Sequence, residues 1–513
     1  MNYSKLGKIL GKIMLLEAIL MLAPLAVAII YKENPRNIVA FAVPIIALTV
    51  LGALSQRLKP QREALYQKEG FALTALVWVV MTLFGAIPFV INGDIPNFID
   101  AWFEITSGFT TTGASIITDI AKMSHSTLFW RSFSHWIGGM GILVFVLIFI
   151  PESDDGSSMH LLRAESPGPQ VGKIASKMKV TAGILYLIYL FMTALAVIVL
   201  MLDDPIAGYE SDHLFFSFLT AFGCAGTGGF GFLPESMAYF SPFSQYVIAT
   251  FLILFGINFS LYYLILIGKI RQVFKSEEFR TYIIVVASAV TIIFFDILLR
   301  CEAISYTVEE AFRHSYFQVA SIITTAGFST TDFNVWPMLS ISTIVVLMFM
   351  GSMAGSTAGG IKLSRIVIAV KGAYINVRKL INPRYVPKAQ FEEKSLEEKT
   401  IADVFSFITL YLFILIAVVF LLSFDPINGR EIIIYSDAYP EGYTVTHGFF
   451  SNFSATLSAL SNIGPGFEAV SAYSSFAGYS LFSKALLTLT MMIGRLEILP
   501  VLILFSPQTW KRT

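Results

Sequence analysis

Long apolar runs separated by short polar stretches constrain the fold of this chain more than any other feature. The first two runs cover residues 13–30 and 38–54, and each approaches the length of about 20 residues that a helix needs to cross a bilayer core. Because 55% of the residues are hydrophobic and only 14% are charged, a soluble fold would expose too much apolar surface. The sequence therefore predicts an all-α polytopic membrane protein surrounded by lipid, without a nucleic-acid partner.

The N-terminus allows two interpretations. Lysines precede the first apolar run, and Ala26-Val27-Ala28 resembles a signal-peptidase site, so a cleaved signal peptide is one of them. The second apolar run begins within a few residues, which favours a retained first helix. We therefore expect an N-terminal transmembrane hairpin over residues 1–60.

Lysine and arginine gather in alternate loops and at the C-terminus. They are Arg57, Lys59, Arg62 and Lys68; Arg163, Lys173, Lys177 and Lys179; Lys269, Arg271, Lys275 and Arg280; Lys371, Arg378, Lys379, Arg384 and Lys388; and Lys511 and Arg512. The loops 202–213 and 423–446 are acidic instead. Because cytoplasmic loops carry the excess of basic residues, both termini are predicted to be cytoplasmic, in a multi-pass protein of the plasma membrane. The acidic outer loops would either attract cations or simply be solvated.

Four outer segments share a pattern that ends in glycine. They are Thr111-Thr112-Gly113, Thr227-Gly228-Gly229, Thr325-Ala326-Gly327 and Asn462-Ile463-Gly464. With these glycines in register, an aromatic residue and a small residue recur upstream. The aromatic residues are Trp102, Phe218, Tyr316 and Phe453, and the small residues are Ser107, Gly223, Ser321 and Ser458. The apolar stretch between them is too short to span, so each repeat predicts a spanning helix, a short re-entrant helix, a glycine-bearing loop and a second spanning helix.

The parallel orientation of the four repeats predicts one pore in a single chain. We place the repeats at residues 61–150, 178–270, 278–372 and 400–508. Irregular backbone at membrane depth is tolerated only where it is buried in protein or lines a wet cavity. Glycines at positive φ can turn carbonyls toward one axis, and a ring of carbonyls can replace the hydration shell of a cation. Loop-tip glycines would explain any one of these segments, but four in register favour the pore.

Each repeat also has a glycine or polar break in its last helix. The breaks are Gly138–Gly141, Gly256–Asn258, Gly351–Gly360 and Gly494-Arg495. The third break cannot form a stable continuous helix, because each interior glycine costs about 1 kcal/mol relative to alanine. We interpret residues 351–361 as a gate below the pore loops, with a packing seam of small residues as the alternative. The predicted gate residues are Gly351, Gly355, Ser356, Thr357, Gly359, Gly360, Lys362, Arg495 and Glu497.

Arg495 and Glu497 are charges within an apolar region, where each costs at least about 2.5 kcal/mol on insertion scales. Arg495 is expected to act as an electrostatic barrier in the pore. The two residues are two positions apart and do not share a helix face, so each needs its own partner, and Lys362 could pair with Glu497. A purely structural ion pair is the alternative interpretation.

Several of these motifs resemble the Trk/Ktr/HKT superfamily of potassium transporters, and within it the bacterial Trk-type transmembrane subunit. They are Thr-Thr-Thr-Gly-Ala at 110–114, Thr-Ala-Gly-Phe-Ser-Thr at 325–330, Ala-Gly-Ser-Thr-Ala-Gly-Gly-Ile-Lys at 354–362 and Gly-Arg-Leu-Glu at 494–497. The resemblance implies potassium bound at the pore-loop residues, a homodimer with one pore per subunit, a cytosolic ring of nucleotide-binding, TrkA-like regulators, and the bacterial inner membrane. Asn462 and Pro465 depart from the threonine pattern, which makes strict selectivity for potassium over sodium less expected.

The function that these features favour is gated, channel-like potassium uptake. A potassium symporter coupled to protons or sodium is the alternative, and its buried carboxylates would be Glu497 and Glu17. A membrane-embedded enzyme would need His, Asp or Glu clustered at one membrane face, whereas the histidines are scattered, so no catalytic activity is predicted. Cys224 and Cys301 lie far apart and have no metal-ligand spacing.

Overall fold

A computed structural model describes residues 1–59, 67–141, 178–382, 389–436 and 438–510, and these are mostly helical. Some of the predicted basic residues lie outside the described residues, as does the end of the first predicted repeat. These are Arg62, Arg163, Lys173, Lys177, Arg384, Lys388, Lys511, Arg512 and residues 142–150.

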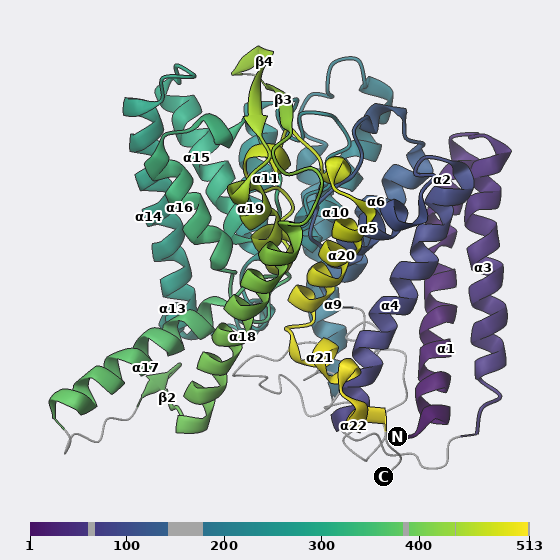
Figure 1. Ribbon diagram of the computed structural model, residues 1–513, viewed down its shortest axis with the longest axis horizontal. Coiled ribbons are helices and arrows are strands. Elements are labelled where there is room, and N and C mark those ends of the chain that lie inside the picture. The colour runs from purple at the N-terminus through teal and green to yellow at the C-terminus, as the bar shows by residue number, and fades with distance from the viewer. Residues whose placement is uncertain (60–66, 142–177, 383–388, 437, 511–513) are drawn as a thin grey trace.

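The N-terminal hairpin is formed by α1 (Tyr3–Leu20), α2 (Leu22–Ile30) and α3 (Pro35–Ser55). Helix α3 begins sharply because the Asn34 side chain accepts from the Arg36 N–H and Pro35 occupies the first turn. Helix α3 packs on α1 and on α4 (Gln67–Asn92), which connects the hairpin to the rest of the molecule. In Figure 1 the hairpin stands at one side of the bundle.

Each of the four predicted repeats contains a long helix, a short helix and a last helix. In chain order they are α4, α5 (Phe98–Phe109) and α6 (His125–Gly139); α9 (Met178–Leu200), α10 (His213–Gly226) and α11 (Pro242–Phe255); α14 (Glu277–Arg300), α15 (Val308–Ile323) and α16 (Met338–Phe349); and α18 (Glu398–Leu422), α19 (Phe449–Ser461) and α20 (Leu481–Arg495). The short helices have 12, 14, 16 and 13 residues, too few to cross a bilayer core. The boundaries of the repeats remain predictions.

Smaller elements follow or connect these helices. They are α12 (Phe259–Leu266), α13 (Ile270–Lys275), α17 (Leu363–Ile381), α21 (Leu499–Phe505), α22 (Pro507–Trp510), and the hairpins β1 (Gln390–Phe391) with β2 (Lys394–Ser395) and β3 (Glu431–Ser436) with β4 (Tyr439–Thr446).

Six helices among the described residues are long and apolar enough to cross a membrane. They are Tyr3–Ile30, Pro35–Ser55, Lys68–Asn92, Val180–Leu200, Glu277–Arg300 and Glu398–Leu422, and the pair α11–α12 would be a seventh, bent by 91°. The last helix of each repeat, which was expected to span the membrane and to carry a glycine or polar break, ends at or beside that break. Glycine and polar residues interrupt the backbone ladder there.

The repeats pack in a closed order. The last helix of each repeat packs on the short helix of the next one: α6 on α10, α11 on α15, α16 on α19 and α20 on α5. The fourth contact returns to the first repeat, so four consecutive segments of one chain surround a common centre.

The two ends of the molecule differ in charge. Both chain termini lie at the lower end in Figure 1, where the Tyr3 hydroxyl donates to the Trp510 carbonyl at 2.7 Å. The basic helices α13 and α17 are at this end, whereas the acidic β3–β4 hairpin is at the opposite end. The separation matches the alternation of basic and acidic loops in the sequence.

An aspartate in each repeat joins the outer part of the first helix to the start of the last helix. Asp94 accepts from Ser124 and Thr127, Asp203 from Ser241 and Ser244, Asp296 from Ser340, and Asp425 from Ser480. For Asp203 and Asp425, burial alone would raise the pKa, but hydrogen bonds from the serines outweigh it and hold the pKa below its ordinary value. These two acidic residues of the outer loops therefore serve as helix anchors.

Candidate ion pathway

Each short helix ends in the same backbone turn. One or two residues after the end of each helix, a residue adopts the left-handed conformation, with φ of 55° at Thr111, 52° at Thr227, 56° at Thr325 and 58° at Asn462. The next N–H donates back to the small residue found in register, from Thr112 to Ser107, Gly228 to Gly223, Ala326 to Ser321 and Ile463 to Ser458, at 2.8–2.9 Å. This is a Schellman-type helix end, with threonine or asparagine where glycine is usual. The recurring small residue is therefore the acceptor of the turn.

The glycines of the four turns close a ring. Their φ values are 79° at Gly113, 69° at Gly229, 82° at Gly327 and 107° at Gly464. A Cβ atom on Gly113 would lie 2.1 Å from the Gly228 carbonyl oxygen, one on Gly229 1.8 Å from that of Ala326, one on Gly327 2.0 Å from that of Ile463, and one on Gly464 2.7 Å from that of Thr112. Each glycine thus touches the carbonyl of the next repeat, and the fourth touches the first. Only glycine fits both the φ and the contact.

The carbonyl oxygens of this ring have no hydrogen-bond partner among the described residues. Those of Thr112, Gly228, Ala326 and Ile463 accept no hydrogen bond from any residue within the described ranges. All four residues are buried, and buried carbonyls in proteins are normally paired. The C-terminal ends of four helices add partial negative charge at the same place. Such an arrangement can coordinate a dehydrated cation.

The four turns differ in what packs behind them. Gly228 replaces the larger residues of the other turns because a Cβ there would lie 2.1 Å from Nδ1 of the buried His135. The Asn462 side chain donates to the Thr112 hydroxyl and the Met491 carbonyl, both at 2.9 Å. Asn462 adopts the same backbone conformation as the threonines of the other turns. The fourth turn differs from the others in the φ of Gly464, which is larger than that of the other three glycines.

A buried ion pair supports the first and second turns. The Arg131 guanidinium lies 2.7 Å from Glu104, and both side chains are at most 1% exposed. Glu104 also accepts from the Ile116 N–H, and Arg131 donates to the Gly231 carbonyl, so the pair fixes the chain after both turns. Neither Glu104 nor Arg131 was predicted to be a site residue, although each is a charge within an apolar stretch of the sequence, as Arg495 is.

The segment between α16 and α17 is an irregular loop that contacts three of the four turns. Thr357 accepts from the Thr227 hydroxyl at 3.4 Å, and the Gly359 N–H donates to the Thr325 hydroxyl at 2.7 Å. A Cβ on Gly359 would lie 2.5 Å from the Ser461 carbonyl. Gly355 and Gly360 have positive φ, and the Gly351 N–H donates to the Ile361 carbonyl, which closes the loop at its base. A seam between regular helices does not describe this segment.

Arg495 connects this loop to the first repeat. Its guanidinium donates to the carbonyls of Thr357 at 2.9 Å and Gly139 at 3.0 Å, and also to that of Gly138. The last two carbonyls are at the C-terminal end of α6, where a cation is favoured. Arg495 and the loop together therefore contact all four repeats.

The suggested pairing of Glu497 with Lys362 is wrong. Glu497 forms its ion pair with Arg365, near the start of α17, and the Lys362 ammonium donates to the Ala358 carbonyl within the loop. Arg365 also stacks on the Phe407 ring at 4.1 Å. Glu497 has a φ of 54°, outside the helix, which turns its carboxylate toward α17 instead of along α20. The backbone turn, which the sequence did not indicate, selects the partner.

The remaining candidates are Glu17 and the two cysteines. Glu17 is fully buried on α1, and no hydrogen bond to its carboxylate is found within the described ranges. Cys224 and Cys301 are unpaired thiols. No group of three or more His, Cys, Asp or Glu residues that could hold a metal ion is found among the residues that the structure describes.

These features define a polytopic helical membrane protein with a cation-compatible ring at the centre of four repeats. The family model for TrkH, described as a cation transport protein, matches residues 35–512. The chain belongs to this family.

Relatives match the chain over its whole length. The Trk system potassium uptake protein TrkH of Escherichia coli (strain K12) is 31% identical, with 100% of both chains covered. TrkG of the same organism is 29% identical, over 98% of this chain and 97% of the relative. The crystal structure of the potassium transporter TrkH from Vibrio parahaemolyticus superposes with a TM-score of 0.83 at 28% identity, covering 100% of both chains.

Proposed function

We propose that this chain takes up potassium through the carbonyl ring as a gated, channel-like protein. The observation that carries the proposal is the closed ring of buried carbonyls that accept no hydrogen bond from the residues described by the structure. Four oxygens in one layer, contributed by four repeats, suit a dehydrated monovalent cation. The potassium uptake named for the E. coli relative supports potassium as the ion.

The loop at 351–361 and Arg495 are the proposed gate. The loop lies against three turns of the ring, and Arg495 brings a permanent positive charge to the same place. A permeating cation would have to displace both, so this arrangement represents a closed state. Deleting part of the loop should raise basal uptake, and unchanged uptake at normal protein amounts would refute the gate.

Rubidium and sodium uptake by Gly113→Ser tests the ring. In cells without other potassium systems, the rubidium-to-sodium uptake ratio should fall because the new side chain would meet the Gly228 carbonyl. Gly183→Ser is the matched control, since a Cβ at that position meets nothing within 4 Å. An unchanged ratio in the Gly113 variant, with normal protein in the membrane, would remove Gly113 from the pathway.

A symporter coupled to protons or sodium is the second candidate. The observation that favours it is Glu17, a buried carboxylate that no described residue hydrogen-bonds. Glu104 and Glu497, in contrast, are held by Arg131 and Arg365. Current reversal potentials under defined gradients separate the two mechanisms: a channel reverses at the potassium equilibrium potential, whereas a coupled ion would shift the reversal. A shift abolished by Glu17→Gln would favour symport.

The assembly and sidedness are further parts of the proposal. We expect a homodimer in the bacterial inner membrane, both termini in the cytoplasm, and a cytosolic TrkA-like ring of nucleotide-binding subunits as the partner. The basic loops at the end that carries both termini support this orientation. Cysteine labelling from either side of the membrane, at Ser4 and at Tyr439, tests it.

A further inference from the structure

Glu278 contacts the 351–361 loop and the start of the helix that follows it. Its side chain is 5% exposed, and one carboxylate oxygen accepts the Ala354 N–H at 2.8 Å and the Ser364 N–H at 3.1 Å. The first amide lies within the gate segment, and the second lies in the first turn of α17, just beyond it. A single carboxylate therefore holds the interior of the loop to the start of α17.

Glu278 is itself positioned by contacts with residues 276, 277, 371 and 390–392, at the proposed cytoplasmic end of the molecule. It lies in the first turn of α14, where Glu392 accepts from the Glu278 N–H at 3.0 Å and from the Ser276 hydroxyl at 2.8 Å. Glu392 thus caps α14 from the turn of the β1–β2 hairpin. Lys371 adds a second connection, because its ammonium reaches Glu277 at 2.5 Å and the Gln390 carbonyl at 2.7 Å.

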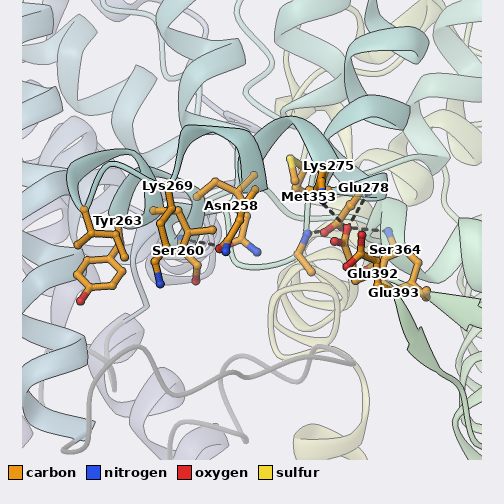
Figure 2. Close-up of a pocket in the computed structure, with 17 residues that line it drawn as sticks. Asn258, Ser260, Tyr263, Lys269, Lys275, Glu278, Met353, Ser364, Glu392 and Glu393 are labelled. Atoms are coloured by element: carbon orange, nitrogen blue, oxygen red, sulfur yellow. Dashed lines mark hydrogen bonds between the residues drawn. The ribbon is translucent and has the colours of Figure 1, made fainter.

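The hairpin turn has a conformation that its residues disfavour. Glu392 and Glu393 have φ of 51° and 60°, a two-residue turn in which asparagine and glycine are usual. The turn directs Glu392 at the start of α14. Glu278 and Glu392 border a pocket of about 680 Å³ that Met353 and Ala354 also line, so the loop has free volume beside it (Figure 2).

We propose that Glu278 is the positioning residue that holds the loop against the ring, and that the 390–395 hairpin controls this hold through Glu392. Displacement of the hairpin by a cytosolic binding event would uncap α14, shift Glu278, and release the loop at Ala354 and the start of α17 at Ser364 together. The inference rests on the proposed gate function of residues 351–361. To that proposal it adds a series of contacts from Glu392 through Glu278 to the loop.

Hydrogen exchange and flux of the full-length protein test this chain of contacts. Glu278→Ala should remove amide protection across residues 352–364 and raise basal rubidium uptake about tenfold, the order expected for losing hydrogen bonds to a charged group. Glu392→Ala should remove protection at residues 277–280 and raise uptake less. Glu393→Ala is the matched control. The contacts with Ser276 and Glu278 belong to Glu392, whereas the Glu393 side chain makes no hydrogen bond or ion pair with a described residue. The Glu393 variant should therefore change neither measurement.

The outcomes separate this inference from the gate proposal. If loop deletion leaves basal uptake unchanged, the gate proposal fails, whatever happens at Glu278. If deletion raises uptake but Glu278→Ala alters neither exchange nor flux, Glu278 is not the anchor. Increased exchange without increased flux would also overturn the inference, because the loop would be released without opening. Should the alanine variant be lost from the membrane, Glu278→Gln, which keeps an acceptor oxygen but loses the charge, should raise exchange and uptake less than alanine would, and Glu392→Ala provides the second comparison; no change in either variant would overturn the inference.

Discussion

The carbonyl ring is nearly symmetric, whereas the layer that contacts it, formed by the 351–361 loop, Arg495 and the end of α6, is not. In the ring, four repeats supply the same turn, the same backbone hydrogen bond and the same glycine-to-carbonyl contact. In the adjoining layer, the third repeat supplies a loop, the fourth supplies Arg495 and the first supplies two acceptor carbonyls. Coordinating one ion requires equivalent oxygens from all sides. The proposed gate, in contrast, needs only one segment that can move into and out of the ion pathway, so the layer beside the ring can be asymmetric.

The largest effect is expected where the ring is tightest. Gly229→Ala would place a Cβ 1.8 Å from the Ala326 carbonyl, at a φ of 69°, whereas Gly464→Ala meets Thr112 at 2.7 Å. We expect Gly229→Ala to abolish rubidium uptake and Gly464→Ala to retain part of it. Uptake per amount of membrane protein measures this order. Equal losses in both variants would mean that the four positions are equivalent despite their different spacing.

Breaking the buried ion pair should affect stability more than gating. Arg131→Ala leaves the Glu104 carboxylate buried without its cation, which costs roughly 3–5 kcal/mol. Thermal unfolding in detergent should show a large drop in Tm, and the double variant Arg131→Met with Glu104→Gln should recover much of it. A single variant as stable as the unaltered protein would contradict the support assigned to this pair.

Arg495 tests the asymmetric layer. A unit charge about 5 Å from a permeating cation costs ~3 kcal/mol at an effective dielectric of 20, equivalent to roughly a hundredfold in rate. Arg495→Ala should therefore raise basal flux substantially, while Arg495→Lys should keep the charge but lose some of the three carbonyl contacts. Alanine that lowers both flux and protein amount would identify Arg495 as a structural residue only.

The smallest effect is expected from making the ring more symmetric. Asn462→Thr matches the other three turns, which hold threonine at nearly the same φ, but it loses two side-chain hydrogen bonds. We expect about 1–3 kcal/mol of lost stability and a rubidium-to-sodium uptake ratio within a few fold of the original. A large gain in this ratio would show that the asparagine itself limits selectivity.

Some features were predictable because they repeat at fixed spacing. Counting back from each glycine gives the acceptor of the turn, so Ser107, Gly223, Ser321 and Ser458 were found without knowing their role. The four aspartate anchors also recur but were missed. From Asp94 to Gly113 is 19 positions, and from Asp425 to Gly464 is 39, because the outer connections vary in length. Contacts across a variable loop have no register that a sequence alignment of repeats can detect.

The sequence by itself determined the membrane class, the four glycine turns and the helix breaks, because apolar length and glycine placement act locally along the chain. Only the tertiary structure decided the partners. Glu497 pairs with Arg365 instead of Lys362 because a left-handed residue redirects its carboxylate. Gly228 is glycine because His135 occupies the adjacent space, and Glu278 matters because folding brings two amides ten residues apart to one oxygen. These relations depend on distances between segments that local propensities do not encode.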